Sequence, residues 1–168
     1  MAPHLQWLSV SEQSPLDRDG PVEVPFDPFD PAWISRPICE RFDQIAGRHL
    51  EKTAVDDGEI CFSYGEIQRA SLVLARSIEA RVPPGSPVGV LLEHSAFFAI
   101  AALACLRVGR PLVPIDPRHP AERNALIGLE AGLQAVISDR VEDELNGLFK
   151  RGVVGRRQLD RNCAGRSA

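Results

Sequence analysis

The chain has 168 residues, of which 44% are hydrophobic and 25% are charged, and its formal net charge is -4 at pH 7. A chain of this length can bury a core and is expected to form one principal domain. The slightly acidic balance gives no reason to expect a nucleic acid or an anionic membrane as a partner.

Export and membrane insertion are also not expected. The N-terminal segment lacks the basic region followed by an apolar run that marks a signal peptide. The longest apolar run, 96–106, has about eleven residues, whereas a membrane-spanning helix needs roughly twenty. The four cysteines form no CxxC pair, so we expect reduced thiols in a cytoplasmic protein. They are Cys39, Cys61, Cys105 and Cys163.

Residues 1–36 are rich in proline, aspartate and serine, and the run PFDPFDP at 25–31 cannot hold a regular helix. We therefore expect an extended N-terminal arm. A helix is expected over 37–49, because Pro37 suits a first turn and apolar residues recur at helical spacing. Its predicted apolar face consists of Ile38, Phe42, Ile45 and Ala46.

Two short strands are expected at 53–55 and 60–62, joined by a turn at Asp56-Asp57-Gly58. The next residues, Ser63-Tyr64-Gly65-Glu66, have the spacing of a capping box, in which the serine hydroxyl and the glutamate carboxylate each accept a backbone N–H. This pattern predicts a helix that ends near Arg81. Its predicted apolar face consists of Ile67, Ala70, Ser71, Leu74, Ala75 and Ile78.

Strands and helices are expected to alternate in the following segment. Strands are predicted at 87–92, 111–115 and 134–138, and helices at 96–108 and 120–132. Ser95 is expected to cap the first of these helices, and Gly109 and Gly132 are expected to close the two. The alternation predicts βαβ units, so the expected fold class is α/β with mostly parallel strands.

The segment 140–168 has a different character. It holds seven basic and four acidic side chains, and it has no strong periodicity past Phe149. We expect a disordered tail that diverges from the domain predicted at 37–139. The change to arginine-rich sequence after about Lys150 leads to the hypothesis of a frameshift or a premature end.

The segments 42–78, 87–117 and 119–138 carry motifs of one protein family in the same order. FSYGEI resembles the family motif Leu-Thr/Ser-Tyr-x-Glu-Leu, and LRVGRPLVPID resembles Leu-Lys-Ala-Gly-x-x-Tyr/Leu-Val-Pro-Leu-Asp. The chain thus resembles the N-terminal part of the adenylation domain of non-ribosomal peptide synthetases, in the adenylate-forming superfamily. Arg107 and Arg110 depart from the motif, where the family usually has a lysine and a small residue.

The motif residues are expected to build the scaffold and not to perform the reaction. They are Ser63, Tyr64, Glu66, Gly109, Pro114, Asp116, Pro117, Pro120 and Arg123. Pro114 and Pro117 are expected to fix the exit of a strand, and Asp116 to accept backbone amides near the next helix. Arg123 is expected to pair with Asp116 or Glu122 and not to bind phosphate.

The resemblance implies a reaction that uses ATP and magnesium, and this chemistry needs a Ser/Thr/Gly-rich phosphate loop and a lysine. No such loop occurs in the chain, and neither Lys52 nor Lys150 lies in a matching motif. We therefore expect no catalytic, cofactor-binding or metal-binding residue here, and no cofactor bound by this chain. His94 and His119 fall at strand ends, where a cap is favoured over a metal site.

The resulting prediction is a truncated N-terminal fragment of an AMP-dependent synthetase/ligase that is inactive by itself. In full-length form it would activate an amino acid or another carboxylic acid as an acyl-adenylate, for transfer to a carrier thiol. Its partner would be a carrier protein or a synthetase. Two alternatives remain open: a stand-alone α/β interaction module that docks on a synthetase or carrier protein, and a small nucleotide-binding α/β protein.

Overall fold

A computed structural model describes residues 30–93, 95–138 and 153–155 of the chain. The chain divides into two compact units, Met1–Ala32 and Trp33–Ala168. The predicted N-terminal arm, 1–36, lies outside the described residues except for its last part, where a short 3-10 helix, η2 (Pro31–Ser35), is found. The description below concerns the second unit.

The second unit contains one antiparallel hairpin and one parallel sheet. In chain order its elements are α1 (Ile38–Arg48), β1 (Thr53–Asp56), β2 (Cys61–Ser63), α2 (Tyr64–Glu79), β3 (Val88–Leu91), α3 (Ala96–Arg107), β4 (Leu112–Ile115), α4 (Ala121–Glu130), β5 (Ala135–Ser138) and β6 (Val153–Gly155). The hairpin is β1-β2, and the four-stranded sheet has the order β4-β3-β5-β6, with each neighbouring pair parallel. The predicted α/β fold is therefore confirmed.

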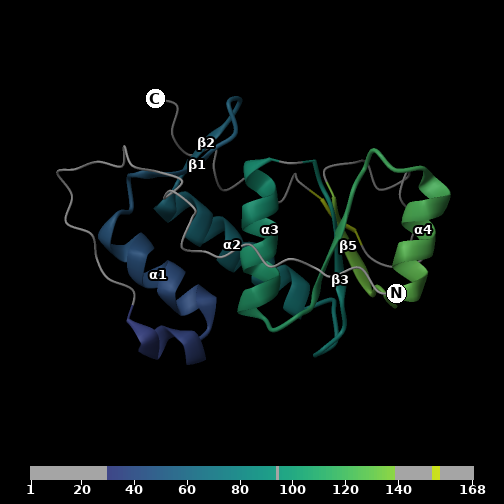
Figure 1. Cartoon of the computed structure of the whole chain (residues 1–168), viewed down its shortest axis with the longest axis horizontal. Helices are drawn as coiled ribbons and strands as arrows, with labels where there is room; N and C mark the ends of the chain where they lie inside the picture. Colours follow the sequence, from purple (N-terminus) through teal and green to yellow (C-terminus); the bar gives the residue numbers. More distant parts are fainter. Residues whose placement is uncertain (1–29, 94, 139–152, 156–168) are drawn as a thin grey trace, which may run out of the picture. The chain divides into compact units, whose positions relative to one another are not determined.

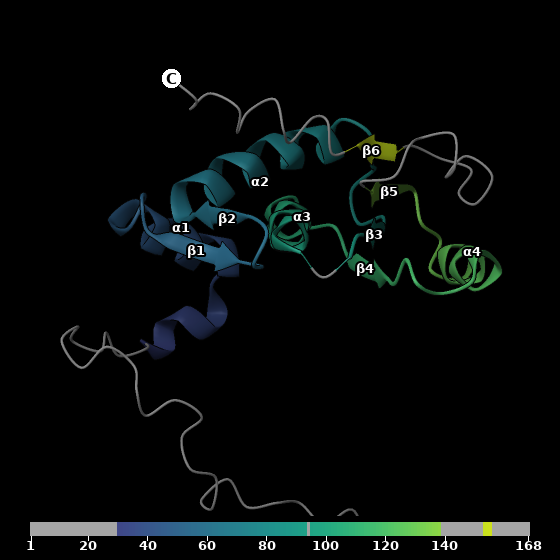
Figure 2. The ribbon, with the colours of Figure 1, turned by 90° about the horizontal axis from the view of Figure 1, so that it is seen from above.

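Helices cover the two faces of the parallel sheet (Figures 1 and 2). The connection from β3 to β4 places α3 on one face, with α2 packed against it, and the connection from β4 to β5 places α4 on the other face. The strands end level with one another, because Leu91 pairs with both Ile115 and Ser138. The carboxyl ends of β3, β4 and β5 thus form one edge of the sheet.

The core consists of two apolar layers separated by the sheet. Val88 and Val90 of β3 point toward α2 and α3, where they pack in a cluster with Ile100. Leu91 belongs to a second cluster on the α4 side, with Val136. Successive side chains of a strand point to opposite faces, so β3 contributes to both layers and all four of its residues are buried.

Helix ends follow the sequence closely in three places. The predicted capping box is present: the Ser63 hydroxyl accepts the Glu66 N–H, and the Glu66 carboxylate accepts the Ser63 N–H at 2.9 Å. Gly109 and Gly132 follow the last residues of α3 and α4 with φ of 60° and 63°. In both helices the two backbone hydrogen bonds of a Schellman motif close the end.

The expected apolar face of α1 differs from the structure at one residue. Ile38, predicted on the apolar face of α1, is 63% exposed, whereas Cys39 is buried. The cause is the approach of α3, because the Cys39 thiol donates to the Leu103 carbonyl at 3.7 Å and this contact sets which face of α1 is covered. The predicted divergent tail, 140–168, lies outside the described residues except for β6 at 153–155, so the expectation for this segment stays a prediction.

At Gly89 the sheet packs closely against the residues on its α4 side. A Cβ atom at this position would lie 2.7 Å from Cδ1 of Leu133 and 3.1 Å from Cδ1 of Ile115. The absence of a side chain at residue 89 therefore lets the segment after α4 pack directly on β3.

We predict that Gly89→Val destabilises the protein by about 2 kcal/mol, because the added methyl groups overpack this layer. The measurement is urea unfolding followed by circular dichroism. Gly47→Ala is the matched control: a Cβ atom added at this position in α1 would have nothing within 4 Å, so the change should be neutral or stabilising by up to about 1 kcal/mol. Equal stability of Gly89→Val and the wild type would contradict this packing.

Candidate functional site

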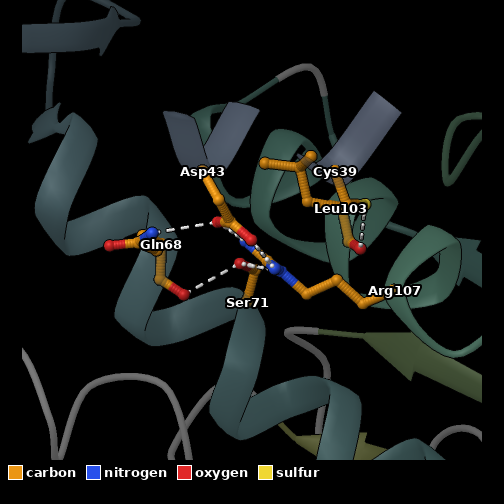
Figure 3. Close-up of polar contacts among 6 residues, drawn as sticks. All are labelled: Cys39, Asp43, Gln68, Ser71, Leu103 and Arg107. Atoms are coloured by element: carbon orange, nitrogen blue, oxygen red, sulfur yellow. Dashed lines mark hydrogen bonds and ion pairs between the residues drawn. The ribbon is translucent and has the colours of Figure 1, made fainter. Parts of the chain in front are cut away.

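Three helices meet at one guanidinium group (Figure 3). Arg107, the last residue of α3, donates from Nη1 and Nη2 to the two carboxylate oxygens of Asp43 in α1, at 2.7 Å and 2.6 Å. Its Nε donates to the Ser71 hydroxyl in α2 at 3.0 Å. The same Asp43 carboxylate accepts from the Gln68 amide of α2 at 3.0 Å. This helix junction fixes α1, α2 and α3 to one another.

The electrostatics of the junction favour a structural role. The hydrogen bond from Arg107 lowers the pKa of Asp43 below its ordinary value, and that bond in turn raises the pKa of Arg107. The nearby Cys39 thiol has its pKa raised by burial, so it stays protonated near neutral pH. A permanently charged ion pair beside a protonated thiol supplies neither a nucleophile nor a general base.

We predict that Arg107→Ala destabilises the protein by about 2 kcal/mol, because Asp43 keeps its charge and loses two hydrogen bonds. Arg107→Lys should recover only part of the loss, since an ammonium group cannot make the bidentate contact. Arg36→Ala is the control: Arg36 and Glu40 form an exposed pair at 2.6 Å, and its removal should cost less than about 1 kcal/mol. Similar losses of unfolding free energy for Arg107→Ala and Arg36→Ala would contradict the structural role.

A pocket of about 400 Å³ lies at the carboxyl ends of β3 and β4. Its apolar lining is Leu92, Phe98, Pro114, Ile115, Pro117 and Ile127. Its polar lining is Glu93, Asp116, Arg118 and His119. We call this the carboxyl-edge pocket. Ligands of open α/β sheets bind at this edge, so it is the candidate site among the described residues.

Hydrogen bonds between Asp116 and Arg118 fix the polar wall of the pocket. Asp116 Oδ1 accepts the Arg118 backbone N–H at 2.9 Å, which confirms the expected contact with a backbone amide near α4. The Arg118 guanidinium also binds both carboxylate oxygens, and these hydrogen bonds hold the pKa of Asp116 well below its usual range. Arg123 was predicted to pair with Asp116 or Glu122. The Asp116 carboxylate is bound by Arg118, which is two residues away in the same turn, and the pairing of Arg123 with Glu122 stays a prediction.

The N-terminal end of α3, opposite the end that carries Arg107, is capped by a residue from a distant segment. Ser95 occupies the cap position of α3 as predicted, yet its side chain makes no capping hydrogen bond. Asp57, in the turn between β1 and β2, accepts the Ala96 N–H at 2.8 Å instead. This bond is the main reason that the pKa of Asp57 is lowered, and the resulting carboxylate suits the positive end of the helix. Periodicity in the sequence gives no signal for this long-range cap.

The remaining motif residues lie in helices and strands or directly beside them. Pro114 lies in β4, Pro120 precedes the first residue of α4, and Arg123 lies in the first turn of α4. Tyr64 begins α2 and packs its ring 6.0 Å from that of Phe42. The structure thus brings Asp116, Pro114 and Pro117 together at the carboxyl-edge pocket, and leaves the capping-box residues at the start of α2.

The part of the chain that the structure describes contains no group of three or more metal-ligating side chains. His94 lies outside the described residues, so the expectation for the pair His94 and His119 is not tested. Among the described cysteines, Cys39, Cys61 and Cys105 are free thiols. No helix among the described residues is long and apolar enough to cross a membrane.

The charged groups on the rim of the carboxyl-edge pocket do not suit the phosphates of a nucleoside triphosphate. Glu93 and Asp116 are acidic groups on its rim, and the Arg118 guanidinium is bound to Asp116. Lys52, the lysine that the structure describes, is exposed in the turn after α1 and does not line this pocket. Phosphate binding needs converging amides or unpaired cations, and the described residues that line this rim do not provide them.

Comparisons with known proteins point to one family. The model of a family described as "AMP-binding enzyme" matches residues 42–163, which include part of the segment expected to diverge. The non-ribosomal peptide synthetase vlms of Lecanicillium sp is 30% identical over 141 residues, covering 83% of this chain and 2% of that protein. The phosphinothricin tripeptide synthetase PhsC of Streptomyces viridochromogenes is 36% identical over 99 residues, covering 58% of this chain and 9% of that protein.

Solved structures of non-ribosomal peptide synthetases and of a related N-terminal subdomain resemble the described fold. The N-terminal subdomain of NpsA from Klebsiella oxytoca superposes with a TM-score of 0.62 at 25% identity, covering 77% of this chain and 34% of that chain. The non-ribosomal peptide synthetase FmoA3 gives a TM-score of 0.66 at 27% identity, covering 77% of this chain and 15% of that one. This chain therefore spans only a small share of the length of its relatives.

Proposed function

This chain belongs to the AMP-binding enzyme family, and we propose that it forms the first part of an adenylation domain whose complete form activates an amino acid or another carboxylic acid. The observation that supports the proposal is the agreement between the family match over 42–163 and the superposition of this fold on the NpsA N-terminal subdomain. The complete domain would use ATP and magnesium to form the acyl-adenylate.

We further propose that the complete protein passes the acyl group to the thiol of a carrier protein. The support is the nature of the curated relatives, which include non-ribosomal peptide synthetases of fungi and bacteria. A cytoplasmic location is part of the same proposal, and the three free thiols among the described residues support it.

The part played by this chain is to build and rigidify the scaffold. Arg107 fixes α1, α2 and α3 to one another, and Asp57 ties the hairpin to α3. The β4–α4 turn is held by Asp116, whose carboxylate accepts from both the backbone N–H and the guanidinium of Arg118. In this proposal the residues that bind the phosphates of ATP are contributed by parts of the adenylation domain other than the carboxyl-edge pocket, whose rim carries Glu93 and Asp116.

We predict that the purified 168-residue chain gives no amino-acid-dependent exchange of pyrophosphate into ATP above background. The physical reason is that the sequence has neither a Ser/Thr/Gly-rich phosphate-loop motif nor a lysine within a matching motif to stabilise charge on the α-phosphate.

The assay would use the standard amino acids and a set of aryl acids, with a complete adenylation domain as the positive control. A cooperative urea transition would show that the tested chain is folded. Exchange that depends on one added acid, and that disappears when the acid is omitted, would contradict the scaffold role.

A further inference from the structure

Helix α4 exposes its large apolar side chains and buries small or polar residues. It buries Asn124, which is 4% exposed, and Gly128. It exposes Leu126 and Leu129, which are 53% and 79% exposed. One exposed leucine is ordinary in a folded protein, but two on one helix whose buried side carries an asparagine are informative. These leucines add nothing to the core of this chain, so a contact with another molecule is the role to examine.

The two leucines lie on the side of α4 that is turned away from the sheet. Residues three apart on a helix are neighbours, so Leu126 and Leu129 form one apolar patch. Figure 2 shows α4 on the opposite face of the sheet from α2 and α3, at the outside of that layer. No described segment covers the patch, because both side chains remain exposed. We call this patch, together with the charges beside it, the outer face of α4.

Opposite charges stand at the two ends of this outer face. Arg123 and Glu130 are both exposed, and they are seven residues apart, which is two helical turns to within about 20°. They therefore lie on the same flank of the leucines, one before them and one after them. Such a flank is complementary to itself. A second α4 that runs antiparallel places its Glu130 beside Arg123 and its Arg123 beside Glu130.

The leucines fit the same antiparallel arrangement. A spacing of three residues is that of the two apolar positions of a coiled-coil heptad. Leu126 of one copy then packs against Leu129 of the other, and the two-fold symmetry repeats the contact. In this register Arg123 and Glu130 of opposite copies are offset by two residues along the axis, about 3 Å, which their side chains can span. Glu122 lies opposite the segment after the other helix and stays in solvent.

We infer that the outer face of α4 is a symmetric self-association surface, on which a second copy of this chain packs its own α4 antiparallel. Two leucines from each copy form the centre of the contact, and two Arg123–Glu130 ion pairs flank it. Because one face carries both charges in complementary order, it matches a second copy of itself. A ten-residue helix from each copy buries less than the roughly 1,200 Å² of a standard interface, so the dimer is weak and reversible.

The test is sedimentation velocity of the 168-residue chain over a range of concentrations. The expected dissociation constant of the dimer is on the order of 100 µM. Arg123→Glu and Glu130→Arg each place like charges opposite one another, so each should weaken dimerisation at least about tenfold. An equimolar mixture of the two variants should associate again, because one copy then carries two acidic groups on the flank and the other carries two basic groups.

Matched controls on α2 separate this contact from general effects of charge and apolar area. Arg76→Glu and Glu79→Arg make the same charge changes at exposed positions and should leave dimerisation unchanged. Leu129→Ala should weaken dimerisation at least about tenfold, since it removes the centre of the contact. Leu72→Ala, at a position that is 42% exposed, should not. A cooperative urea transition would show that each variant is folded.

Three results would overturn the inference. The first is a chain that stays monomeric at the highest concentration, as expected if another protein covers the leucines. The second is dimerisation that survives both Arg123→Glu and Leu129→Ala, which would place the contact on another surface. The third is a mixture of the two charge variants that associates no more tightly than either variant alone. Dimerisation does not depend on adenylation activity, so the pyrophosphate assay and this experiment can fail independently.

Discussion

The burial of β3 on both of its faces is the constraint on which the rest of the structure depends. Its Val88 and Val90 complete the layer under α2 and α3, while Leu91 completes the layer on the α4 side. Gly89 leaves the space that Leu133 fills. Because β4 and β5 pair with β3 in parallel and in level register, the strand also fixes where the carboxyl edge and its pocket lie. The helix junction at Arg107 then attaches α1 to this core.

Features set by local chemistry could be read from the sequence. The capping box at Ser63 and Glu66 requires only a spacing of three residues, and the structure contains both of its hydrogen bonds. Gly109 and Gly132 stop helices because a left-handed backbone costs little for glycine. The apolar face of α2 was also predictable, since its residues recur at helical spacing and are buried as expected.

Features set by contacts between distant segments could not be read in the same way. The capping hydrogen bond of α3 comes from Asp57, which lies 39 residues before the amide whose N–H it accepts, whereas Ser95 occupies the cap position without making that bond. The covered face of α1 depends on where α3 passes, so Cys39 is buried and Ile38 is not. The pocket could not be predicted either, because it needs the ends of two strands and a turn that close around it.

The central claim is that β3 anchors the fold of this chain, and native-state hydrogen exchange tests it most directly. If the claim is correct, the amides of Val88–Leu91 exchange only through global unfolding, with a free energy equal to that from urea unfolding. Amides in the turn at Gly58 should exchange with a much lower free energy. Exchange of the β3 amides as fast as that of Gly58, under conditions where the protein remains folded, would contradict the account.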